Sequence, residues 1–161
     1  MRELREQVTL KCPVEDAESR VLAFFAGRRA ADGTLRMRLR VPAGSESRFN
    51  YSISRLVRVE AKLGKDEDDL NEVIKVSWRP EGTAMLPQFE GKLTVWGDDD
   101  LSKTVLELDG RYLPPFGIAG QVFDEAIGQQ IAHATAAEFL SDIKRWVDAP
   151  PGSALDVGRD V

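Results

Sequence analysis

The sequence predicts an α+β fold in which a curved antiparallel sheet of six or seven strands wraps around one long C-terminal helix. Between residues 35 and 112, apolar and polar residues alternate within successive segments, a pattern typical of strands with one buried face. Short polar segments rich in Gly, Asp and Asn separate them, as expected of turns. Beyond Pro114 and Pro115, a helical spacing of apolar residues continues to Val147.

The alternation and the turn signals predict strands at 6–13, 35–41, 51–63, 72–79, 88–96 and 103–112. A short helix is expected at 15–27, because acidic residues occupy its first turn and Gly27 ends it. The long helix is expected at 118–147. Its second half has one apolar side, whereas its first half has two. We therefore expect the first half to be covered on two sides, by the sheet and by a loop, the short helix, a second subunit or a ligand.

Hairpin geometry makes the predicted register specific, because directly opposed residues point to the same side of an antiparallel sheet. When each turn is taken as the midpoint of its hairpin, Gly91 lies opposite Gly110, Trp78 opposite Phe89, and Leu63 opposite Glu72. Each pairing keeps the apolar residues of adjacent strands on one face. A shift of one residue would move apolar side chains to the outer face. The strands from residue 35 onward are therefore expected to form a meander with one continuous inner face.

Composition limits the classes of function. The 161 residues suit one domain, expected over residues 1–148, followed by a disordered tail at 149–161. A net charge of −5 argues against a general nucleic-acid-binding protein. Cys12 is the single cysteine, so an intrachain disulfide is excluded. The sequence shows neither a signal peptide nor an apolar run long enough to span a membrane, so a cytoplasmic location without stable membrane insertion is expected.

The residues from 87 to 140 carry a resemblance to a known superfamily. The segment LELDGRYLPPFGIAGQVFDEAIGQQIA resembles a GxYxPPxGxxGxxxD passage of bacterial START-like proteins, the superfamily that includes the polyketide cyclases (SRPBCC). The matching positions are Gly110, Tyr112, Pro114, Pro115, Gly117, Gly120 and Asp124. The resemblance implies a helix-grip fold with an apolar cavity between the sheet and the C-terminal helix. It implies no single activity, because members of the superfamily transport, sense, cyclise or bind.

Several inner-face residues are candidates for a ligand site in that cavity, although each also has a structural interpretation. Gly91 and Gly110 either relieve a bend in the sheet or leave space for a ligand. Arg55 interrupts an apolar face, so it either binds an acidic group of a ligand, turns outward at a bulge, or pairs with Glu72 or another acid. Aromatic and aliphatic residues either fill the core or line the site: Trp78, Phe89, Tyr112, Phe123 and Ile127.

Catalytic candidates are weaker. Tyr112 and His133 could exchange a proton with a substrate, but a lone helical histidine is more often structural. A Cys12–His133 pair is conceivable, although a thiol on an inner face usually acts as a small hydrophobic residue. With one histidine and one cysteine, no multi-histidine or multi-cysteine metal site can form, and no cofactor is expected.

Three functions follow. The first is the binding of a small hydrophobic molecule, such as a lipid, a polyketide or an aromatic compound, between sheet and helix. The second is a cyclase or aromatase activity in the same cavity, with a polar residue transferring a proton. The third is a domain with a filled core that acts through protein contacts, for example as a homodimer. Binding ranks first, because the sequence supplies few polar groups for catalysis.

Overall fold

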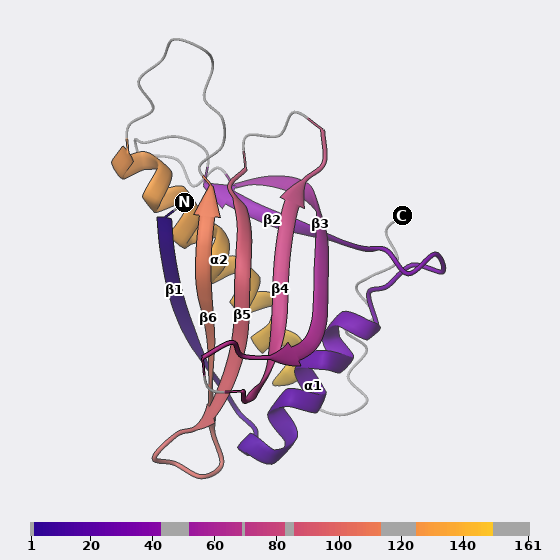
Figure 1. The fold of residues 1–161 in the computed structure, drawn as a ribbon, viewed down its shortest axis with the longest axis vertical. Coiled ribbons are helices and arrows are strands. Elements are labelled where there is room, and N and C mark those ends of the chain that lie inside the picture. Colours follow the sequence, from indigo (N-terminus) through magenta and orange to yellow (C-terminus); the bar gives the residue numbers. More distant parts are fainter. Residues whose placement is uncertain (1, 43–51, 69, 83–85, 114–124, 150–161) are drawn as a thin grey trace.

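The computed structural model describes residues 2–42, 52–68, 70–82, 86–113 and 125–149, with the backbone alone at 40–42, 52–55 and 125–127. Six strands and two helices follow one another along the described chain (Figure 1). In order these are β1 (Arg2–Leu10), α1 (Val14–Ala26), β2 (Leu35–Pro42), β3 (Ser52–Lys65), β4 (Glu72–Pro80), β5 (Gln88–Gly97), β6 (Thr104–Leu113) and α2 (Glu125–Val147).

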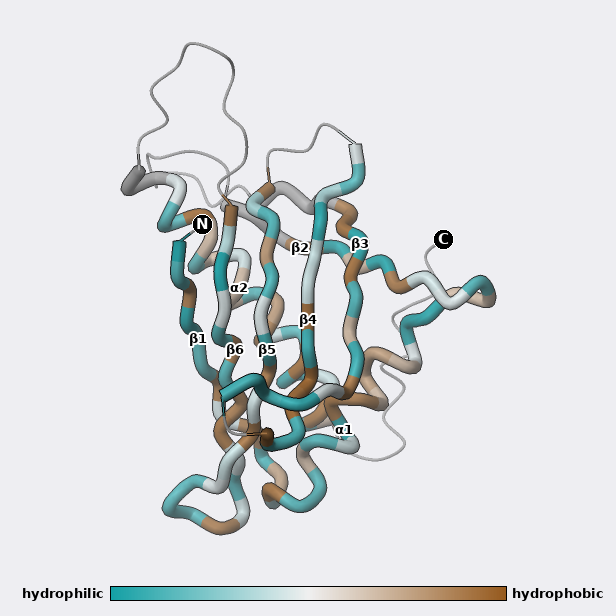
Figure 2. The backbone as a smooth tube through the Cα atoms, viewed as in Figure 1, coloured by the Kyte–Doolittle hydropathy of each residue, from teal (hydrophilic) through white to brown (hydrophobic). Residues whose placement is uncertain are grey.

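The strands form one antiparallel sheet in the order β1-β6-β5-β4-β3-β2, so β2 to β6 are a meander and β1 joins it beside β6. Hydrophobic and hydrophilic residues alternate along the strands (Figure 2), as the period of two requires. The structure confirms the predicted pairings of Gly91 with Gly110 and of Trp78 with Phe89. The predicted fold class is therefore confirmed.

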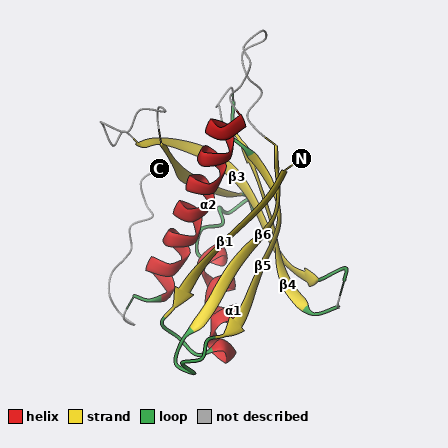
Figure 3. Ribbon diagram, turned by 90° about the vertical axis from the view of Figure 1, so that its left-hand side faces the viewer, coloured by secondary structure: helices red, strands yellow, loops and turns green. Residues whose placement is uncertain are grey.

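One face of the sheet, the inner face, is covered by α2, which lies along the sheet with α1 beside its C-terminal half (Figure 3). The aromatic residues Phe24 and Phe25 of α1 join the same core as Phe139 of α2. These rings and inner-face residues of every strand form one hydrophobic core within the described part of the chain. The two helices therefore depend on the sheet for their burial.

Two predictions of detail are wrong. The first strand is Arg2–Leu10 and not 6–13, because Leu4 continues the alternation and pairs with Gly110. Leu63 pairs with Ile74 and not with Glu72, since the β3–β4 hairpin closes at Lys65 and Glu72. The start of the long helix, predicted at 118, and most of the predicted tail lie outside the described residues.

Candidate functional site

Three aromatic residues of the inner face lie in one row across neighbouring strands. The register pairs Tyr112 with Phe89, and Phe89 with Trp78. The rings of Trp78 and Phe89 are stacked, with centroids 4.4 Å apart, and Phe139 of α2 contacts Trp78 at 5.1 Å. The indole Nε1 of Trp78 donates to the carbonyl of Pro87 at 3.1 Å, so this ring is fixed in orientation. The row is thus rigid at Trp78.

Tyr112 lies at the β6 end of this row, and its environment differs from that of Trp78. Its side chain is only 1% exposed, yet no described residue forms a hydrogen bond with its hydroxyl. Every fully enclosed side-chain nitrogen or oxygen in the described part of the chain has a partner. The Tyr112 oxygen therefore borders either open space or a group outside the described residues. A polar group that borders open space can bind a water molecule or a ligand.

Gly91 and Gly110 face each other beside the aromatic row. A Cβ atom on Gly91 would lie 2.3 Å from the carbonyl oxygen of Asp109 and 2.6 Å from Cζ of Phe89. A Cβ atom on Gly110 would lie 2.4 Å from the carbonyl oxygen of Glu90. The two glycines thus let adjacent strands approach closely, and the Phe89 ring occupies the space that they leave. A ligand could use this space only if Phe89 moved.

Arg55 lies toward the end of the sheet where Tyr112 is found, but Glu72 does not. The register places Arg55 opposite Leu39, whose side chain is fully buried. Glu72 pairs with Lys65, ten residues further along β3, which is about 33 Å of extended chain. A pair between Arg55 and Glu72 is therefore excluded. Phe123 and the side chains of Arg55 and Ile127 lie outside the described residues, so their predicted roles stay predictions.

His133 of α2 contacts Glu6 of β1, with 2.5 Å between Nδ1 and the carboxylate. Cys12 lies far from this pair. It is next to Lys11, whose backbone N–H donates to Asp148, and Asp148 is 15 residues beyond His133, about 22 Å along a helix. Burial also raises the pKa of the Cys12 thiol, which keeps it protonated and unreactive. The structure therefore does not place Cys12 and His133 together. Glu6 was not singled out from the sequence, because only packing of α2 on β1 reveals the contact.

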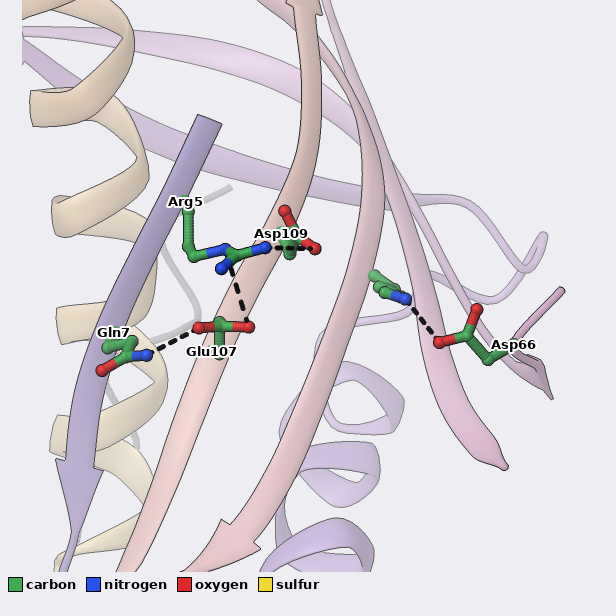
Figure 4. A network of polar contacts seen from close by, with 6 residues as sticks. Arg5, Gln7, Asp66, Glu107 and Asp109 are labelled. Atoms are coloured by element: carbon green, nitrogen blue, oxygen red, sulfur yellow. Dashed lines mark hydrogen bonds and ion pairs between the residues drawn. The ribbon is translucent and has the colours of Figure 1, made fainter. Parts of the chain in front are cut away.

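The opposite face of the sheet, the outer face, contains a hollow of about 800 Å³ over β3 to β6 and β1. Charged residues line it, and several form pairs (Figure 4). Arg5 contacts Asp109 at 3.4 Å and Glu107 at 3.9 Å, and Gln7 donates to Glu107 at 2.6 Å. This hollow is polar and lies on the other side of the sheet from the predicted apolar cavity. Residues 114–124, which precede α2, are outside the described part of the chain.

Lys92 and Asp66 form an ion pair at one wall of the hollow. The ammonium group of Lys92 lowers the pKa of the Asp66 carboxyl, and the carboxylate raises the pKa of Lys92. The pair connects the tip of the β3–β4 hairpin to β5. Asp66 belongs to a polar turn segment of the sequence and Lys92 to a strand, and alternation cannot predict that they meet.

The fold can be compared with known proteins. Neither a protein-family model nor a curated protein matches the sequence. Among solved structures, the Zhui aromatase/cyclase from Streptomyces sp. R1128 matches with a TM-score of 0.51 at 13% identity, covering 91% of each chain. The chain has the helix-grip fold. The protein TTHA0849 from Thermus thermophilus also matches, with a TM-score of 0.48 at 14% identity, over 91% of this chain and 97% of that one. At 13% identity, the match to the Zhui aromatase/cyclase is a likeness of fold alone.

The described residues contain neither a helix that could span a membrane nor a group of side chains placed to bind a metal. No helix there is long and apolar enough to cross a membrane. No group of three or more His, Cys, Asp and Glu side chains is placed to hold a metal ion among the residues whose side chains are described.

Proposed function

We propose that this protein binds a small hydrophobic molecule between the inner face of the sheet and α2, at the end where Tyr112 lies. The observation that carries the proposal is Tyr112: the residue is only 1% exposed, and its hydroxyl has no hydrogen-bond partner among the described residues. A polar group that borders open space at a buried position can form a hydrogen bond with water or a ligand there. Ligand sites combine apolar walls with a few such polar groups.

The surrounding residues support a ligand that is flat and mostly apolar. Leu86 and Phe89 are buried near the same end of the sheet, and apolar side chains of this kind can pack on a planar molecule. Arg55 occupies a register position on the inner face, so we propose that it binds an acidic group of the ligand. Gly91, Gly110, Trp78, Phe123 and Ile127 complete the proposed site, with the glycines allowing Phe89 to approach the sheet.

A cyclase or aromatase activity at this site is the second candidate, because the Zhui aromatase/cyclase shares the fold. In this version Tyr112 exchanges a proton with a bound substrate. His133 is less suited, since its Nδ1 already contacts Glu6. The third candidate, a domain acting through protein contacts as a homodimer, requires a filled interior.

Native mass spectrometry of the gently purified protein separates these candidates. An added mass that is lost on denaturation supports a bound ligand and allows its identification. If the chain is bare and sedimentation shows a dimer, the homodimer candidate is favoured and the binding proposal loses its main support.

A paired-probe experiment tests the role of Tyr112. 2-Naphthol and naphthalene differ by one hydroxyl, so the ratio of their affinities measures a hydrogen bond in the site. We expect the wild-type protein to prefer 2-naphthol, and Tyr112→Phe to reduce that preference by about five- to tenfold while binding naphthalene as well as before. His133→Gln is the matched control and should leave the preference unchanged. An unchanged preference in Tyr112→Phe would contradict the assignment.

A further inference from the structure

Three arginines lie side by side on the outer face at the β2 edge of the sheet. The register pairs Arg36 of β2 with Arg58 of β3, and Arg58 with Arg79 of β4. All three residues are exposed, and Arg38, two positions along β2 from Arg36, is exposed as well. We call Arg36, Arg38, Arg58 and Arg79 the arginine row. Directly opposed like charges destabilise a sheet, so this arrangement calls for a physical reason.

Acidic residues neutralise the arginine row only in part. Glu81 contacts Arg36 at 2.8 Å and Arg58 at 3.8 Å. Asp32 lies close enough to Arg36 to influence it, but its carboxylate accepts hydrogen bonds from the backbone N–H and hydroxyl of Thr34, at 2.9 Å and 2.6 Å. Arg38 and Arg79 form no ion pair with any described residue. Glu60, on the next row of the outer face, is exposed. The arginine row therefore keeps a surplus of positive charge at this corner, although the whole chain carries −5.

The geometry suits an extended anion. Neighbouring strands are about 4.8 Å apart, so the three opposed arginines span about 10 Å. Guanidinium groups bind phosphate oxygens through two parallel hydrogen bonds, and they keep their charge at any physiological pH. A single phosphate would contact one or two of these groups. Several linked phosphates could contact all three.

We propose that the arginine row is a second binding site, on the opposite side of the sheet from the hydrophobic ligand, for a small molecule that carries two or more linked phosphate groups. In the free protein, Glu81 occupies part of this site and holds Arg36 and Arg58 in place. The anion then competes with the Glu81 carboxylate for the same two guanidinium groups.

Isothermal titration of the full chain with inorganic triphosphate at low salt tests this site. We expect binding that Arg58→Gln weakens by about tenfold or more, because Arg58 is central in the row. Glu81→Gln should strengthen binding, since it removes the competing carboxylate. Lys62→Gln is the matched control, because Lys62 is four residues from Arg58 on the same strand and face, and this variant loses the same charge. It should change the affinity less than twofold. Thermal unfolding of each variant without triphosphate confirms that it is folded.

Four results would overturn the proposal, three with triphosphate and one with sulfate. One is the absence of triphosphate binding at concentrations up to roughly 1 mM, which means a binding free energy weaker than about −4 kcal/mol. Another is equal weakening by Lys62→Gln and Arg58→Gln, which would show diffuse attraction to the outer face. The third is a Glu81→Gln variant that binds no better than the wild type. Sulfate at matched ionic strength is the single-anion control, and equal binding of sulfate would show that the row does not recognise linked phosphates.

Discussion

At the scale of single residues, the Gly91–Gly110 contact fixes how closely β5 and β6 can lie. A Cβ atom on Gly91 would lie 2.3 Å from the carbonyl oxygen of Asp109 and 2.7 Å from Cα of Gly110. Backbone atoms of two paired strands cannot yield as the end of a flexible side chain can. The need for glycine at this position is therefore a property of the sheet itself, whether or not a ligand uses the adjacent space.

Gly91→Ala is expected to lower the free energy of unfolding by about 1–3 kcal/mol, because the added methyl group forces the strands apart. Gly97→Ala on the same strand is the control, since the nearest atom to its Cβ is Cγ1 of Val14 at 4.0 Å. That variant should change stability by less than about 0.5 kcal/mol. Urea unfolding of both variants without ligand is the measurement. Equal stabilities would show that the strands can separate at Gly91 without cost.

At the scale of elements, the Asp66–Lys92 pair fastens the tip of the β3–β4 hairpin to β5. Lys92 holds the pKa of Asp66 below its usual value in the folded protein. The stabilising contribution of this carboxylate is therefore present above its unfolded pKa of about 3.9. It is lost as the pH falls through the lower, folded pKa.

Asp66→Asn should accordingly be less stable than the wild type at pH 7, and the difference should shrink as the pH falls below about 4. Urea midpoints measured from pH 7 to pH 2.5 report this directly. Glu67→Gln, an exposed neighbour, serves as the control and should show a much smaller difference at neutral pH. A difference between Asp66→Asn and the wild type that stays constant across the acid range would rule out the ion pair as its source.

The hairpins also show what the sequence could and could not predict. Turn position and apolar alternation predicted the register at Trp78 and Gly91, because a shift of one residue would expose the apolar face. They failed at Leu63, where the observed pairing differs by two residues. A shift of two keeps every side chain on its face, so alternation cannot detect it. For the same reason, alternation alone does not reveal that three arginines of neighbouring strands are adjacent on the outer face.

The prediction of the candidate site from the sequence was limited in the same way. The inner-face position of Tyr112 could be predicted from its strand, and the structure places it in one row with Phe89 and Trp78. Whether its hydroxyl finds a partner depends on contacts between elements distant in sequence. The contact of Glu6 with His133, across 127 positions, is of this kind. Local patterns carry no information about such contacts.

At the scale of the whole molecule, Phe139 connects the three layers of the core. The centroid of this fully buried ring is 5.1 Å from that of the Trp78 ring of β4 and 6.1 Å from that of the Phe25 ring of α1. The buried residues of both helices belong to the same core cluster as those of the strands, so sheet, α1 and α2 should unfold together.

Phe139→Ala is expected to lower the free energy of unfolding by about 3–5 kcal/mol, through lost burial and the cavity left behind. Urea unfolding followed by tryptophan fluorescence and by far-ultraviolet circular dichroism should give coincident transitions in the wild type and in the variant. Glu138→Ala, the adjacent position on α2, should change stability little. Trp146 belongs to α2 and Trp78 contacts α2 through Phe139, so the tryptophan signal reports the packing of the helix on the sheet. Transitions at different urea concentrations would show that this packing and the secondary structure are lost in separate steps, which would contradict unfolding as one unit.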